Sequence, residues 1–281
     1  MNTRFLNIEN GRLAYDDAGA GPLVVCAPGM GDVRGEYRFL APQLAAAGYR
    51  VASVDVRGHG ETSERWPDYS VGAIGADLLA LIRHLDAGPA VIIGTSMAAA
   101  AAVWAAAEAP ERVAGLVLVG PFVRGVNTWQ DRLMSGGLQL LFGALFARPW
   151  GPGRWARYYA GLYPTRRPAD LDDYCAALRA NLAAPGRLEA LHAMLRAPKN
   201  AAEARLPRVA APALVVMGTK DPDFKDPAAE AGWVAQQVRG TVRLIPGAGH
   251  YPHAEMPEIV GPVVLGFLES LREKEAGAHG A

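Results

Sequence analysis

The chain has 281 residues, 51% of them hydrophobic and 20% charged, so it is long enough for a buried α/β core and unlike a disordered chain. Lysine and arginine together number 28, as do aspartate and glutamate, so no basic excess indicates a nucleic-acid partner. The two cysteines, Cys26 and Cys175, do not suggest a disulfide framework, and no Cys/His spacing indicates a metal site.

The sequence also lacks the patterns of membrane or secretory segments. The N-terminus has no apolar stretch of the signal-peptide kind. The longest apolar stretch, residues 133–146, is shorter than the ~20 residues that a membrane span needs. We therefore expect a soluble cytoplasmic protein.

Residues 4–16 predict two short strands around the turn dipeptide Asn10-Gly11. After them, short apolar runs bounded by Gly and Pro alternate with helical patterns. This alternation is typical of a mostly parallel sheet, buried on both faces by helices. The predicted strands are 23–27, 50–55, 90–94, 115–119, 213–217 and 241–245, and the predicted helices are 36–47, 71–85, 97–109, 226–238 and 257–275.

One long segment interrupts the alternation of strands and helices. Between Gly120 and Pro212 there is no strand-like run, and Pro and Gly divide the segment into short helices. A long insertion in a compact domain is usually functional. We expect an α/β core of residues 1–120 and 212–281, with residues 121–211 as a helical cap over the carboxyl ends of the strands, where open sheets bind ligands.

Ser96 lies between a predicted strand and a predicted helix, in the pentapeptide Gly94-Thr95-Ser96-Met97-Ala98. Small residues at both ends let strand and helix approach closely around a strained turn, with the hydroxyl at its apex. The first amides of the helix favour negative charge at the same point. The pentapeptide suggests a nucleophile, although a serine that only caps the helix is equally compatible with it.

A nucleophilic serine needs a base, and the chain has six histidines. His250 directly follows the glycines of the loop after the last predicted strand. That loop emerges at the same sheet edge as Ser96, because parallel strands share a direction. His253, three residues on, is the competitor. We expect the remote histidines to be structural or solvated: His84, His192 and His279.

Asp221 is the favoured partner for this base, because it follows the preceding strand directly and is fixed by Pro222. A carboxylate there can hold the imidazole tautomer and stabilise the imidazolium. Asp223 and Asp226 are alternatives, and each of the three aspartates could instead form a turn or cap a helix.

Two backbone amides are candidates for an oxyanion hole. Met30 lies in the glycine-rich loop 27–32, after the first buried strand, and Met97 directly follows Ser96. Their N–H groups can stabilise an oxyanion, so the side chains at these two positions matter less.

The order Ser96, Asp221, His250 resembles that of the α/β-hydrolase fold. Residues 55–63, Asp-Val-Arg-Gly-His-Gly-Glu-Thr-Ser, are similar to the Asp-x-Arg-Gly-His-Gly-x-Ser segment of that superfamily, and residues 248–258 to its histidine loop. The resemblance covers about residues 4–271. It implies a serine hydrolase with a helical cap that needs no cofactor or metal, and makes His59 a structural loop residue.

The chain departs from the family pattern at two positions. Pro28 replaces the histidine that usually precedes the oxyanion-loop glycine, and Ala98 replaces the second glycine of the serine turn. Neither change removes a reacting group. Because position 96 is Ser and not Asp, the resemblance argues against the haloalkane dehalogenase and epoxide hydrolase branches.

These observations predict cleavage of a small or medium apolar ester-like substrate through an acyl-enzyme. A carbon–carbon bond hydrolase and a cofactor-free perhydrolase would use the same triad, and a ligand-binding protein with a weakly active triad is an alternative of another class. Apolar and aromatic residues of the predicted cap suggest the pocket, although packing explains any single one of them equally well. The pocket candidates are Leu133, Leu138, Phe142, Phe146, Trp155 and Tyr158.

Overall fold

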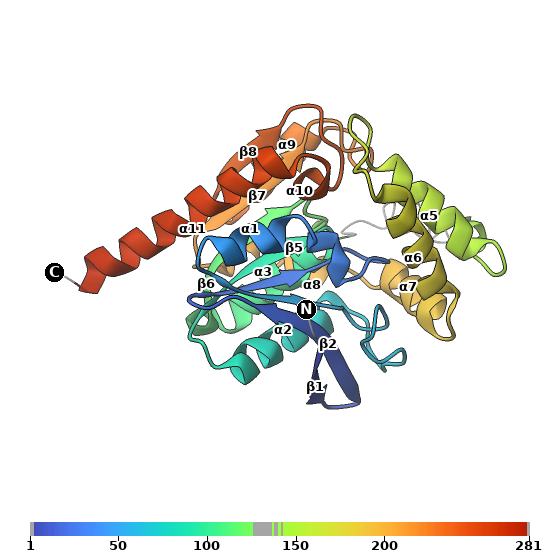
Figure 1. Cartoon of the computed structure of the whole chain (residues 1–281), viewed down its shortest axis with the longest axis horizontal. Coiled ribbons are helices and arrows are strands. Elements are labelled where there is room, and N and C mark those ends of the chain that lie inside the picture. The colour runs from blue at the N-terminus through green and yellow to red at the C-terminus, as the bar shows by residue number, and fades with distance from the viewer. Residues whose placement is uncertain (1–2, 126–136, 138–139, 142, 280–281) are drawn as a thin grey trace.

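The computed structural model of the protein describes residues 3–125, 137, 140–141 and 143–279, and an eight-stranded sheet lies at its centre (Figure 1). The strand order is β1-β2-β4-β3-β5-β6-β7-β8. Strand β2 is antiparallel to β1 and β4, and the other neighbouring pairs are parallel, which confirms the mostly parallel sheet. The strands are β1 (Arg4–Ile8), β2 (Gly11–Ala18), β3 (Leu23–Ala27), β4 (Arg50–Val54), β5 (Ala90–Thr95), β6 (Val113–Val119), β7 (Ala213–Gly218) and β8 (Thr241–Ile245).

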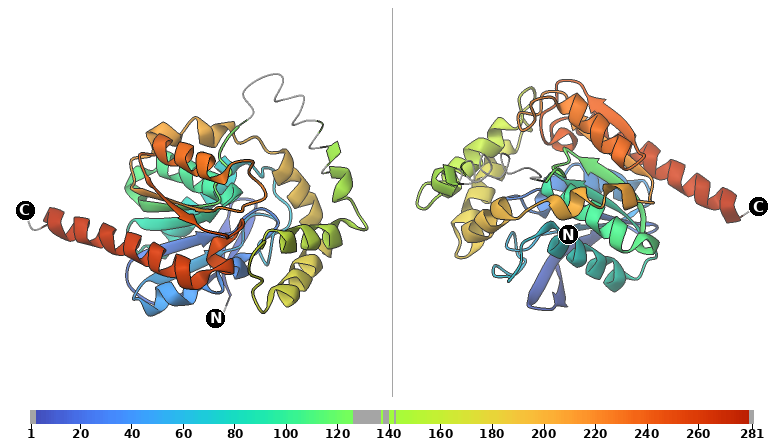
Figure 2. Two further views of the ribbon diagram at one scale, coloured as in Figure 1. Left: turned by 90° about the horizontal axis from the view of Figure 1, so that it is seen from above. Right: turned by 180° about the vertical axis from the view of Figure 1, so that it is seen from behind.

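Helices cover both faces of the sheet and divide the apolar core into two main layers. On one face pack α1 (Leu40–Ala46) and α11 (Pro257–His279). On the other pack α2 (Val71–Leu85), α3 (Met97–Glu108) and α9 (Pro227–Gln237). Figure 2 shows the sheet between these layers, with the C-terminal end of α11 extending away from the body.

The predicted helix 36–47 is wrong in its first half. The structure has a 3-10 turn, η1 (Arg34–Tyr37), followed by α1 from Leu40. Pro42 explains the break, because a helix continuing from residue 36 would need a backbone N–H at position 42. In the observed helix, Pro42 lies in the first turn, where no intrahelical donor is needed.

The segment between β6 and β7 is helical in the part that the structure describes, and we call its described residues within 121–211 the insertion. Its helices α5, α6 and α7 lie together at one side of the molecule (Figure 1). The insertion contacts the loops that follow β3, β7 and β8, so it lies over the carboxyl ends of these strands. The exact limits of the predicted cap, residues 121–211, stay a prediction. The insertion's elements are α5 (Gly151–Gly161), α6 (Leu171–Ala183), α7 (Arg187–Arg196), α8 (Asn200–Glu203) and the 3-10 turn Leu206–Arg208.

Among the described helices, none combines the length and the apolar character needed to cross a bilayer.

The turn between β5 and α3 depends on close packing at Gly94. A Cβ at this position would lie 2.6 Å from the carbonyl oxygen of Ala98 and 2.8 Å from the backbone nitrogen of Ala99. Helix α3 can approach this closely because it presents the short side chains of an alanine run, all of them buried. The glycine at 94 is therefore required, whereas Ala98 is accommodated at the position where the family usually has glycine.

We expect Gly94→Ala to lower the free energy of unfolding by about 1–3 kcal/mol, because the added methyl overpacks the turn. Urea denaturation measures the change. The matched control is Gly266→Ala in α11, where a Cβ meets nothing within 4 Å. This control should raise stability by up to about 1 kcal/mol. Equal unfolding midpoints for both variants and the wild type would contradict the close approach at Gly94.

Candidate active site

Ser96 occupies a strained turn between β5 and α3. Its φ of 55° and ψ of −117° lie in a region that costs a non-glycine residue about 1–3 kcal/mol. Backbone hydrogen bonds hold the turn: the Ser96 N–H donates to the Val119 carbonyl at 2.9 Å, and the Ser96 carbonyl accepts from Phe122 at 3.2 Å. The hydroxyl makes no capping hydrogen bond to α3, so the helix-capping interpretation of Ser96 fails.

The two predicted oxyanion donors lie beside this turn. A Cβ at Gly29 would be 3.4 Å from the Cβ of Ser96, which places the loop of Met30 against the serine. Met97 is the first residue of α3, where backbone N–H groups have no intrahelical acceptor. The N–H groups of Met30 and Met97 donate to no acceptor among the described residues. Both amides can therefore donate to a bound oxyanion.

Glu36 supports the loop of Met30, a role that no sequence pattern predicts. Its carboxylate is fully buried and accepts the Gly29 N–H at 2.8 Å. Burial raises the pKa of Glu36 to about 7, against hydrogen bonds from Thr95 and Gly29 that lower it. The backbone next to Met30 is thus held by a buried acid on η1.

His253, the competing base, faces Glu36 and is stacked on Tyr37. Its Nε2 lies 3.0 Å from Glu36 Oε1, and its ring centroid lies 5.0 Å from that of Tyr37. Burial lowers the pKa of His253 to about 3. His253 thus packs against Glu36 and Tyr37 of η1, next to the loop of Met30.

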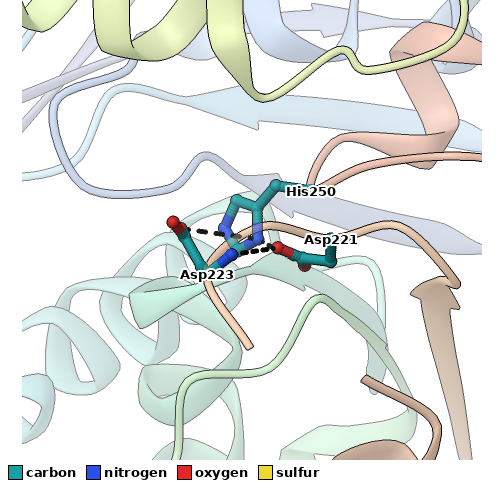
Figure 3. Close-up of side chains that lie close together, drawn as sticks. All are labelled: Asp221, Asp223 and His250. Carbon is teal, nitrogen blue, oxygen red and sulfur yellow. Dashed lines mark hydrogen bonds and ion pairs between the residues drawn. The ribbon is translucent and has the colours of Figure 1, made fainter. Parts of the chain in front are cut away.

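His250 and Asp221 form a buried pair at the carboxyl ends of β8 and β7. His250 Nδ1 lies 2.7 Å from Asp221 Oδ2, and the two side chains are 2% and 0% exposed (Figure 3). The imidazole also lies against Gly120, where a Cβ would be 3.1 Å from its Cε1 and Nδ1 atoms. Gly120 directly follows Val119, which binds the Ser96 backbone, so this glycine brings the ring next to the serine turn.

The three candidate aspartates have separate roles in the structure. Asp221 holds His250, and its Oδ1 accepts the backbone N–H of Asp223 at 3.0 Å. Asp223 Oδ2 stands farther from His250 Nδ1, at 3.8 Å. Asp226 caps α9 by accepting the Ala229 N–H at 3.0 Å.

The charges around His250 favour its protonated form. Burial opposes the imidazolium, but the negative charge and hydrogen bond of Asp221 outweigh it, with smaller contributions from Asp223 and Glu36. Together they raise the pKa of His250 to about 9. These surroundings stabilise the positive charge that the imidazole gains when it takes a proton.

The same cluster has the spacing of a cation site, but hydrogen bonding already explains it. One ligand atom each from Asp221, Asp223 and His250 lies within 4.8 Å of the others. The imidazole nitrogen facing Asp221, however, is engaged in the 2.7 Å hydrogen bond. We assign no metal to this cluster.

The segment 55–63, which resembles a family motif, is structural. His59 is buried and its Nδ1 lies 2.9 Å from the Arg57 carbonyl oxygen. Burial lowers the pKa of His59 to about 4. Asp55 accepts the backbone N–H groups of Arg34 at 2.7 Å and Glu61 at 2.9 Å, which ties this loop together.

Of the six pocket candidates, the described ones form an aromatic cluster in the insertion. The ring centroids of Phe146 and Trp155 are 5.2 Å apart, and those of Trp155 and Tyr158 are 5.3 Å apart. Phe146 and Trp155 are buried, so both pack the insertion, whereas the Tyr158 hydroxyl reaches Asp223 at 2.6 Å. The remaining pocket candidates lie outside the described residues: Leu133, Leu138 and Phe142.

A model of the alpha/beta hydrolase fold matches residues 22–257 of the chain. The chain belongs to the α/β-hydrolase fold family. It is 31% identical over 287 aligned residues to a Mycobacterium tuberculosis protein named "Putative non-heme bromoperoxidase BpoC", covering 92% of this chain and 98% of that one. The crystal structure of that protein superposes with a TM-score of 0.74, over 92% of this chain and 96% of that chain.

Other α/β hydrolases are similar over part of the chain or in fold. A 2-hydroxy-6-oxo-6-phenylhexa-2,4-dienoate hydrolase from Burkholderia cepacia is 33% identical over 50% of each chain. A hydrolase from Pseudomonas aeruginosa, at 25% identity, superposes with a TM-score of 0.76 over 95% of this chain and 98% of that one. The relatives thus carry the names of more than one activity, bromoperoxidase and dienoate hydrolase among them.

We expect Asp221→Asn to lower the pKa of His250 by at least about one unit, because burial then acts against the imidazolium without its main counter-charge. An NMR titration of the His250 ring protons measures the shift. Asp226→Asn is the matched control: it removes one charge from the same loop and keeps a residue that can cap α9. A His250 titration that is unchanged in Asp221→Asn would contradict the pairing.

Proposed function

We propose that this α/β hydrolase is a serine hydrolase that cleaves a small or medium apolar ester-like substrate through an acyl-enzyme. The observation that carries the proposal is the buried 2.7 Å hydrogen bond between Asp221 and His250, held over Gly120 beside the strained turn of Ser96. A nucleophile, a base and an orienting acid in this relation support acyl transfer.

In the proposed reaction, the Ser96 oxygen attacks the substrate carbonyl carbon while its proton passes to His250. Asp221 keeps the imidazole oriented and stabilises the imidazolium. His250 then returns the proton to the leaving group. A water molecule next gives a proton to His250 and attacks the acyl carbon, and the Ser96 oxygen departs with the proton that His250 returns to it.

The N–H groups of Met30 and Met97 are the proposed oxyanion donors. Each donor of this kind supplies about 3–4 kcal/mol of transition-state stabilisation. The buried Glu36 fixes one side of this arrangement through Gly29. Pro28 in place of the family's usual histidine is compatible with this arrangement. The proposed donors are backbone N–H groups, so the side chain at position 28 would not contact the oxyanion.

The insertion is the proposed cap, with limits at residues 121–211, over a core of residues 1–120 and 212–281. Its aromatic residues Phe146, Trp155 and Tyr158 favour an apolar acyl or aromatic group, and Tyr158 reaches the loop of the triad. Leu133, Leu138 and Phe142 complete the proposed pocket on sequence grounds alone.

Two other reactions are candidates because relatives of this chain are named for them. The bromoperoxidase name favours a perhydrolase, in which peroxide and not water would release the acyl group. The dienoate hydrolase favours cleavage of a carbon–carbon bond. Product analysis with esters, diketones and added peroxide separates the three reactions. A protein that only binds its ligand would show no steady turnover on short p-nitrophenyl esters.

We expect Ser96→Ala to abolish ester turnover and covalent labelling by a fluorophosphonate probe while leaving the fold intact, because the variant lacks the nucleophile. Mass spectrometry of the labelled wild type should place the probe on Ser96. Ser270→Ala, which removes a hydroxyl from α11, is the control and should keep both labelling and turnover. Retained turnover in Ser96→Ala would refute the proposal.

The raised pKa of His250 predicts an alkaline activity profile. Only the neutral imidazole can accept the serine proton, and the protonated form dominates below a pKa of about 9. We therefore expect kcat/KM for an ester to rise ~tenfold per pH unit below this value and to level off above it. A profile that is flat between about pH 6 and 9 would contradict this prediction.

A further inference from the structure

Asp223 stands between His250 and the insertion, and its two carboxylate oxygens have different partners. Oδ2 lies 3.8 Å from His250 Nδ1. Oδ1 accepts a 2.6 Å hydrogen bond from the hydroxyl of Tyr158 on α5. Figure 3 shows Asp221 and Asp223 approaching the imidazole from two sides. One carboxylate thus connects the helix of the insertion to the ring of the proposed base.

A backbone hydrogen bond fixes the main chain of Asp223, whereas the orientation of its carboxylate depends on the hydrogen bond from Tyr158. The Asp223 N–H donates to Asp221 Oδ1 at 3.0 Å, so the two aspartates share one turn. The Asp221 side chain is 0% exposed, whereas that of Asp223 is 23% exposed. A carboxylate with access to water can rotate away from the imidazole unless a partner holds it.

We propose that Asp223 is a positioning residue for His250 and that Tyr158 holds it in place, so that docking of α5 strengthens the hold of the imidazole on a proton. This inference rests on the proposed function. In the reaction, one proton moves from Ser96 Oγ to His250, and Asp223 takes no proton. Its negative charge, facing the ring, favours the imidazolium that this transfer creates.

Other groups around the His250 ring also favour or disfavour the imidazolium, so the effect of Asp223 must be separated from theirs. The negative charge of Asp221 is the dominant attraction, followed by its hydrogen bond, and buried Glu36 adds a weaker attraction. The imidazolium in turn disfavours a charge on His253. Among the described residues, the titratable groups that face His250 are Asp221 and Asp223 after β7, Glu36 on η1, His253 on α10 (Pro252–Glu255), and the adjacent Tyr251.

The experiment compares the His250 titration by NMR, and the pH profile of kcat/KM for an ester, across a set of variants. Asp223→Asn should lower both midpoints by about one pH unit, because it removes a charge close to the ring. Tyr158→Phe should lower them by less, because the charge remains but is no longer oriented. Asp226→Asn, which removes a charge from the same loop at the cap of α9, should leave both midpoints unchanged.

The double variant decides whether Tyr158 acts through Asp223. We expect Asp223→Asn with Tyr158→Phe to match Asp223→Asn alone. Unchanged midpoints in Asp223→Asn, or a double shift equal to the sum of the single shifts, would overturn the proposal. If Asp223→Asn does not fold, Tyr158→Phe alone tests the proposal, and unchanged midpoints in that variant overturn the proposal. The NMR titration needs no turnover, so failure of the serine mechanism, read from Ser96 labelling, is a separate result.

Discussion

The arrangement of the site depends on one buried hydrogen bond, between Asp221 and His250. Two ionisable side chains are stable there because each satisfies the other in a place that water does not reach. To form the bond, the loops after β7 and β8 must leave the sheet at the same edge and meet, which parallel strand direction ensures. Gly120 has no side chain, and a side chain at this position would keep the imidazole away from the serine turn.

Around this bond, the insertion braces both halves of the site. The Trp155 indole N–H donates to the Gly31 carbonyl at 3.1 Å, next to the loop of Met30. Three residues later on the same helix, Tyr158 reaches the loop of Asp221 through Asp223. Residues three apart on a helix share a face, so α5 is the common support of the two loops. Gly31 allows this contact, because a Cβ there would lie 2.3 Å from the Trp155 ring.

Local patterns predicted the sheet, most helices and the positions of Ser96, His250 and Asp221, because each of these residues lies in the turn or loop that follows a strand. The strand order and the split between η1 and α1 required the structure. The preceding glycines favour His250 over His253, and in the structure His253 packs against Tyr37 and Glu36. Glu36 and the link from Tyr158 to Asp223 were beyond prediction, because each role rests on a single side-chain hydrogen bond that no sequence periodicity marks.

The double contact of α5 has a consequence for how substrate range can change. Trp155 and Tyr158 are candidates for the proposed pocket, and both also bind the loops that carry the proposed chemistry. A change of pocket shape at either position therefore also disturbs the backbone at Gly31 or the carboxylate at Asp223. In the proposed function, specificity and rate are therefore coupled, and a shift to a new substrate through α5 requires matching changes in its partners on the core.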